Sequence, residues 1–197
     1  PTQTPKALED SVSKLLEIPA ENITVSMTRI GGGFGRRLYV HFGVEAAAIS
    51  KKMGAPIKLI YTREDDMTQG TYRPAYRSVY KAGLDKNNNL IAFSVKGVGL
   101  PAGPVYPNRF PAGTVDNYLA ENKMSYTNIS TGAWTAPRSH FTAGAEQSFI
   151  DEVAETAEKD PIDFRLELFN KAINNPVGKK YDYDADRYAG VLKLVKE

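Results

Sequence analysis

The chain has 197 residues, of which 42% are hydrophobic and 24% are charged, a composition typical of a globular protein. Its 25 basic and 23 acidic residues leave a net charge of +2, too balanced to indicate a nucleic-acid or anionic-membrane partner. There is no cysteine, which excludes disulfides, iron–sulfur ligation and a thiol nucleophile within the chain, and two histidines are too few for a histidine-rich metal site.

The sequence contains no apolar run near the roughly 20 residues that are needed to span a membrane. The first residue is Pro1 rather than Met, so any leader lies before it. A cytoplasmic and a periplasmic location therefore stay equally open.

The first third of the chain is expected to alternate helices and strands. Apolar residues recur at helical spacing behind Pro5, and Ile23 to Arg29 alternates apolar and polar side chains. The predicted elements are a helix over 5–17, a strand over 23–29, a buried helix over 44–53 ending at Gly54, a strand over 57–61 and a polar turn opened by 63–66.

The remainder is predicted to be a hairpin followed by helices. Strands are expected over 78–84 and 90–99 around an Asn-rich hairpin loop, then a long loop over 99–117 and another strand over 124–130. Helices are expected over 141–157, from 161 onward and over 184–196, so that 139–197 is mainly helical. Because helices and strands are interleaved without a regular period, the predicted fold class is mixed α+β.

The run from Gly31 to Arg37 stands between a predicted strand and a predicted helix. Successive glycine N–H groups can converge on an anion there, and Arg36 and Arg37 would add charged donors for a phosphate. The alternative is a tight strand-to-helix turn without a ligand. A Rossmann turn would need glycine at Arg36, and no P-loop string occurs, so the run matches neither pattern.

The segment Thr28–Arg37 resembles the Gly-Gly-Gly-Phe-Gly signature of the large subunit of the xanthine oxidase/aldehyde oxidase family. Its Arg-Arg ending is most similar to the isoquinoline 1-oxidoreductase beta-subunit branch. Three other segments resemble that family in the same order and carry the likeness along nearly the whole chain: the Thr-Gln segment at 1–5, the Arg-Glu-Asp segment at 61–74, and 132–137 with the helix at 146–154.

The resemblance implies a partial molybdopterin-binding domain over 1–197, cut from a longer subunit. The parent subunit would be a molybdenum hydroxylase that oxidises an N-heteroaromatic or aldehyde substrate with oxygen derived from water. The cofactor is expected to be molybdenum–molybdopterin in its cytosine dinucleotide form, and a small partner subunit would carry iron–sulfur clusters. The implied cofactor-side residues are Gln3, Gly32, Gly33, Phe34, Gly35 and Arg36, and the implied substrate-side residues are Trp134, Thr135 and Ala136.

Two departures limit what the chain can do alone. Thr135 stands where the family commonly has an arginine, and Arg138, three residues on, is a candidate substitute. The family's general-base glutamate lies far toward the C-terminus, in a part that residues 1–197 do not match. Glu146, Glu152 and Glu155 fall on the scaffold helix and are not assigned that role. The chain is therefore expected to need the missing C-terminal half, and the alternative is a non-catalytic anion-binding or scaffold module.

Overall fold

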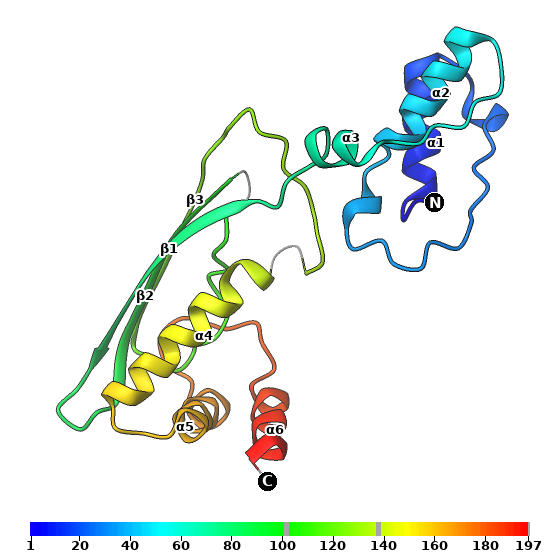
Figure 1. The fold of residues 1–197 in the computed structure, drawn as a ribbon. Coiled ribbons are helices and arrows are strands. Elements are labelled where there is room, and N and C mark those ends of the chain that lie inside the picture. The colour runs from blue at the N-terminus through cyan, green and yellow to red at the C-terminus, as the bar shows by residue number, and fades with distance from the viewer. Residues whose placement is uncertain (101–102, 137–138, 197) are drawn as a thin grey trace. The chain divides into compact units, whose positions relative to one another are not determined.

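The computed structural model describes residues 1–100, 103–136 and 139–196 (Figure 1). They form two compact units: unit 1 comprises Pro1–Arg73 with Asn128–Pro137, and unit 2 comprises Pro74–Thr127 with Arg138–Glu197. Helices and strands both occur, which confirms the mixed α+β class. None of the helices in the described ranges is both long and apolar enough to cross a membrane.

Unit 1 is built on two packed helices. Its helical elements are α1 (Pro5–Leu16), η1 (Ala20–Asn22), η2 (Arg36–Leu38), α2 (His41–Met53) and α3 (Arg63–Thr68). The predicted helices over 5–17 and 44–53 are confirmed, although α2 begins at His41. Gly43 allows the close approach of α1 and α2, because a Cβ atom there would lie 2.6 Å from Leu8 Cδ1.

Three predictions for unit 1 are wrong. Residues 23–29 and 57–61 are not strands, because neither pairs with another segment among the described residues, and a strand exists only through such pairing. Residues 63–66 do not form a turn but open α3. There Asp65 N donates to Thr62 Oγ1 and Thr62 N donates to the Asp65 carboxylate, a reciprocal cap that starts a helix.

Unit 2 holds a three-stranded sheet with helices on one face (Figure 1). Its elements are β1 (Ala75–Leu84), β2 (Leu90–Leu100), β3 (Asn117–Met124), α4 (Ser139–Thr156), α5 (Pro161–Asn174) and α6 (Ala185–Lys196). The predicted β1–β2 hairpin is confirmed, and Tyr80 stands opposite Val95. The predicted helices are confirmed as well, with Asp160 accepting hydrogen bonds from Ile162 N and Asp163 N at the start of α5.

The strand predicted over 124–130 is wrong in position. The third strand ends at Met124, where it pairs in parallel with Gly99 near the end of β2. Past that point β2 offers almost no further backbone, so the chain leaves the sheet.

The long loop after β2 belongs to the core of unit 2. Val105, Phe110 and Val115 are buried with Phe93 of β2 and with apolar residues of α4 and α5. A Cβ atom on Gly97 would lie 2.8 Å from Pro104 Cγ, so the loop lies directly on β2. The described part of this loop therefore covers the sheet.

Candidate functional site

The glycine loop, residues 31–37, has an unusual backbone. Gly31 and Gly35 have φ values of +73° and +81°, and Phe34 between them has φ +51°. A left-handed conformation costs a residue with a Cβ about 1–2 kcal/mol. The Phe34 side chain is 69% exposed, so packing does not explain this cost. A strained and exposed aromatic residue is typical of a functional loop.

Gln3 lies directly against the glycine loop. Its backbone N–H donates to Arg37 O over 2.9 Å, and Thr2 Oγ1 donates to the same carbonyl oxygen over 3.3 Å. A Cβ atom on Gly33 would lie 2.5 Å from Gln3 Cδ. The structure thus brings together two of the predicted cofactor-side residues, and a side chain at position 33 would displace the end of the Gln3 side chain.

The substrate-side loop, residues 132–136, contacts the same glycine run. A Cβ atom on Gly35 would lie 2.6 Å from Trp134 Cα. Ala133 N donates to Tyr39 Oη over 2.6 Å, and Gly132 N donates to Tyr72 O over 2.9 Å. The two groups of predicted site residues, far apart in sequence, therefore form one continuous surface of unit 1.

Within this loop, Trp134 has an indole Nε1 that is buried without a hydrogen-bond partner among the described residues. Such a donor usually finds a partner when it is buried. Ala136 also has a positive φ, of +51°. Strain and an unsatisfied donor therefore occur together on the substrate-side loop, as they do at many binding sites.

An arginine other than the candidate Arg138 contacts Thr135; Arg138 itself lies outside the described residues. Arg73 Nη1 donates to Thr135 O over 3.4 Å. Sequence reasoning missed Arg73 because it stands far from Thr135 in the chain and approaches it only where Tyr72 pairs with Thr131. Arg73 thus brings a guanidinium to the substrate-side loop.

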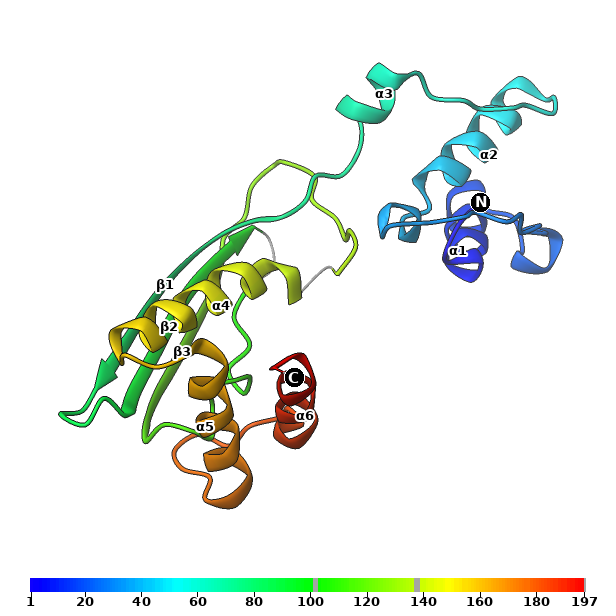
Figure 2. The ribbon, with the colours of Figure 1, turned by 60° about the horizontal axis from the view of Figure 1, so that its bottom comes forward.

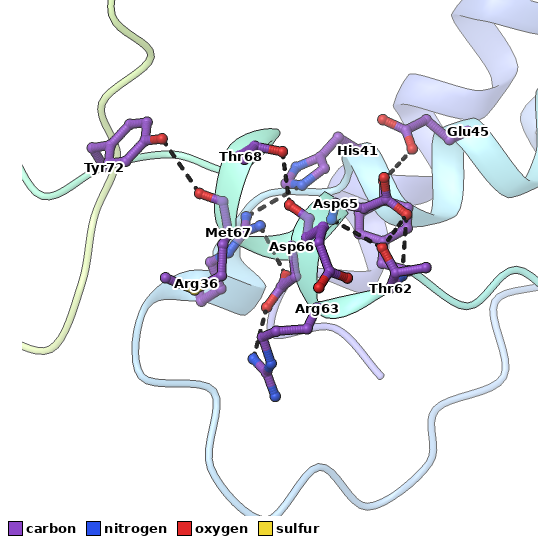
Figure 3. A network of polar contacts seen from close by, with 12 residues as sticks. Arg36, His41, Glu45, Thr62, Arg63, Asp65, Asp66, Met67, Thr68 and Tyr72 are labelled. Carbon is purple, nitrogen blue, oxygen red and sulfur yellow. Dashed lines mark hydrogen bonds and ion pairs between the residues drawn. The ribbon is translucent and has the colours of Figure 1, made fainter.

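Arg36 is held inside a polar network (Figure 3). Its Nη1 lies 3.2 Å from His41 Nε2 and its Nη2 lies 3.4 Å from Asp66 Oδ1. Burial, followed by the nearby Arg36 charge, lowers the pKa of His41, so a neutral imidazole can accept the Arg36 hydrogen bond. The guanidinium of Arg36 therefore ties the glycine loop to α2 and α3, which leaves the backbone as the part of Arg36 that can face an anion.

Arg37 shares one contact with Arg36, the aromatic ring of Phe42. The Cζ atoms of Arg36 and Arg37 lie 4.8 Å and 4.7 Å from the centre of the Phe42 ring. Both cations therefore interact with one aromatic residue at the start of α2. This contact fixes the end of the glycine loop on the helix.

A family model described as a molybdopterin cofactor-binding domain matches residues 1–169. Among curated relatives, the membrane-bound aldehyde dehydrogenase [pyrroloquinoline-quinone] of Gluconacetobacter polyoxogenes is 27% identical over 80% of this chain and 23% of its own. The isoquinoline 1-oxidoreductase subunit beta of Brevundimonas diminuta is 28% identical over 86% and 24%. The aldehyde oxidoreductase molybdenum-binding subunit PaoC of Escherichia coli is 27% identical over 79% and 22%.

Among solved structures, quinoline 2-oxidoreductase from Pseudomonas putida 86 matches 99% of this chain and 27% of its own, with a TM-score of 0.73 and 20% identity. Aldehyde oxidoreductase from Desulfovibrio gigas matches 94% and 22%, with a TM-score of 0.67 and 14% identity. These likenesses concern the fold. The chain spans about a quarter of the length of the relatives that it matches.

Proposed function

Because the chain belongs to the family of molybdopterin cofactor-binding domains, we propose that its glycine loop and substrate-side loop form one wall of a molybdopterin site. The cofactor-side residues are Gln3 and the run from Gly32 to Arg36, and the substrate-side residues are Trp134, Thr135 and Ala136. The parent subunit is a molybdenum hydroxylase, similar to isoquinoline 1-oxidoreductase, that oxidises an N-heteroaromatic or aldehyde substrate with oxygen derived from water.

The observation that carries this proposal is the pair of glycine contacts. Gly33 leaves room for Gln3, and Gly35 leaves room for the backbone of Trp134. At Gly35 the φ of +81° would favour glycine in a simple turn as well, but the Trp134 backbone in addition leaves no space for a Cβ atom, and at Gly33, whose φ is not left-handed, a simple turn needs no glycine. The residues fit an anionic, polar cofactor because the Gln3 amide side chain lies beside a run of glycines whose N–H groups can bind an anion.

Each residue has a distinct task in this proposal. The Gln3 amide donates a hydrogen bond to an oxygen of the cofactor, and the N–H groups of the glycine loop bind its anionic groups. Phe34, exposed and fixed by its backbone, excludes water from one side. When bound, the cofactor supplies two-electron oxidation chemistry that no side chain of this chain can supply.

Other parts of the enzyme complete the proposed site. The C-terminal half of the parent subunit supplies the general-base glutamate and the remaining walls, and a small partner subunit carries iron–sulfur clusters. The cofactor is the cytosine dinucleotide form. Residues 1–197 alone are therefore inactive.

The test is metal and pterin analysis of the parent subunit purified from a molybdenum-replete host. Stoichiometric molybdenum with a pterin nucleotide is the expected result. Pyrroloquinoline quinone in place of the pterin, or neither group, would overturn it. A subunit that lacks both groups but binds inorganic phosphate would instead be the non-catalytic anion-binding module.

A further inference from the structure

Helix α3 has little helix packing to hold it in unit 1. In both ribbon views it stands between two extended stretches of chain (Figures 1 and 2). Within the described residues, no other helix of unit 1 packs along it. The helix has six residues, and an isolated helix of that length is marginal in water. Its side-chain contacts are therefore needed to fix its place.

The principal contact of this kind joins Asp66 to the glycine loop. Asp66 Oδ1 accepts a hydrogen bond from Arg36 Nη2 over 3.4 Å, and the Arg36 side chain is only 13% exposed. A guanidinium that has lost most of its hydration requires an anionic partner in a fixed position. Arg63 also lies 3.7 Å from Asp66, but its side chain is 79% exposed, and exposed pairs contribute little. The contact with Arg36 is therefore the one that matters for structure.

The chain that leaves α3 also lies against Arg36. A Cβ atom on Gly70 would lie 2.8 Å from Arg36 Nη2 and 3.1 Å from Asp66 O. The guanidinium thus occupies the space beside the Gly70 backbone. Arg36 therefore contacts both the helix and the segment that follows it.

That same segment reaches the substrate-side loop. Tyr72 N donates to Ser130 O over 2.8 Å, and Gly132 N donates to Tyr72 O over 2.9 Å. The Tyr72 hydroxyl donates back to Met67 O in α3 over 3.3 Å (Figure 3). Residues 66–72 therefore connect Arg36 of the glycine loop to the loop that contains Trp134.

We propose that Asp66 is a positioning residue of the molybdopterin site. By holding Arg36, it fixes the glycine loop relative to the substrate-side loop. This inference rests on the proposed function in one respect, that the two loops are walls of one cofactor site. The contacts that carry it belong to unit 1 alone.

The strain in the glycine loop explains why such a residue is needed. Phe34 has a left-handed backbone, and Arg36 lies only two residues after it. A strained conformation persists only where its surroundings over-determine it. Gln3 and the Trp134 backbone restrain the loop at Gly33 and Gly35. The contact between Arg36 and Asp66 adds a restraint from α3.

Amide hydrogen exchange of the parent subunit tests the proposal. Asp66→Asn removes the charge and keeps the size of the side chain. Glu64→Gln makes the same change at an exposed position of α3 and is the matched control. In Asp66→Asn, amides of residues 31–37 and of residues 130–134 should exchange about fivefold faster. Glu64→Gln should leave both segments unchanged. Unchanged exchange in Asp66→Asn, or equal acceleration in the two variants, would overturn the proposal.

A double-mutant cycle tests whether Asp66 acts through Arg36. Arg36→Met removes the guanidinium and retains an apolar stem. In that background, Asp66→Asn should have no further effect on the exchange of the two loops. Asp66→Glu, in the presence of Arg36, should restore most of the slow exchange because it restores the charge. A full effect of Asp66→Asn without Arg36 would mean that Asp66 only stabilises α3.

Cofactor retention distinguishes a positioning role from a purely structural one. After dilution of the loaded subunit, the half-life of pterin release should be about fivefold shorter in Asp66→Asn than in Glu64→Gln. Equal half-lives would contradict a positioning role. A parent subunit without molybdenum and pterin would contradict the proposed function instead, while the exchange of the two loops would still decide whether Asp66 couples them.

Discussion

A Cβ atom on Gly35 would lie 2.6 Å from Cα and 2.7 Å from the carbonyl carbon of Trp134. Both are backbone atoms, which cannot rotate away as the end of a side chain can. The glycine loop and the substrate-side loop therefore touch only because position 35 has no side chain. Their contact joins the two groups of residues that the proposed site requires.

Gly35→Ala is expected to separate the two loops. The φ of +81° alone costs an alanine about 1–2 kcal/mol, and the clash with Trp134 adds about 1–3 kcal/mol. Molybdenum content of the purified parent subunit, measured against protein, should fall sharply.

Gly31→Ala is the matched control for Gly35→Ala. Gly31 lies in the same loop with a similar φ of +73°, and nothing lies within 4 Å of a Cβ built there. The Gly31→Ala variant should therefore be destabilised by backbone strain alone, and it should retain more molybdenum than Gly35→Ala. Equal losses in the two variants would show that the contact with Trp134 does not matter.

The contact between Gln3 and Gly33 predicts non-additive substitutions. The backbone of Gly33 is not left-handed, so the effect of Gly33→Ala should come from displacing the end of the Gln3 side chain. In a Gln3→Ala background that obstacle is gone. The two substitutions should therefore couple by about 0.5–3 kcal/mol in the free energy of unfolding. Chemical denaturation of the four variants of the cycle measures this, and strictly additive effects would contradict it.

The sequence predicted most of the helices and the hairpin because their signals are local. Pro5 and Asp160 start helices, and Gly54 ends one with a φ of +63°. In the hairpin loop, Asp85 Oδ1 accepts hydrogen bonds from Asn87 N and Asn89 N, which accounts for its polar composition. Each of these depends on residues a few positions apart.

Apart from 63–66, where the cap between Thr62 and Asp65 is local, the errors concern features that depend on distant partners. Residues 23–29 have the alternation of a strand but no partner to pair with among the described residues, and the third strand is placed by β2 rather than by its own composition. In the site, the resemblance placed Gln3 near the glycine loop. It did not predict that Asp66 holds Arg36, or that Arg73 reaches Thr135.

His41 is expected to make stability depend on pH. Its pKa is lowered in the folded chain from the ordinary value of 6.5, chiefly by burial and then by Arg36. The unfolded chain therefore binds a proton more readily, and stability is lost as pH falls through 6.5 toward the folded pKa. Thermal unfolding of the chain at pH 8 and pH 5 should show this loss. His41→Gln, which retains a hydrogen-bond acceptor for Arg36, should reduce it, and an unchanged pH profile in that variant would contradict the assignment.

Glu146 is expected to make stability depend on pH in the direction opposite to His41. Burial, partly offset by Arg109, raises the pKa of this carboxyl group to about 7 in a cavity of unit 2 that Arg109 and Phe169 also line. The folded chain then binds the proton more tightly than the unfolded chain. Stability contributed by the neutral form is complete below pH 4.5 and is lost as pH rises through about 7.

Glu146→Gln should therefore stabilise the chain at pH 8, by up to about 3 kcal/mol, and change little at pH 4. The amide keeps the shape of the neutral acid and cannot ionise. Glu155→Gln, at an exposed position of the same helix, is the matched control and should have a small effect at both pH values. Urea denaturation at the two pH values measures the difference in the free energy of unfolding. If Glu146→Gln is no more stable than the unsubstituted chain at pH 8, the charged carboxylate of Glu146 is not destabilising.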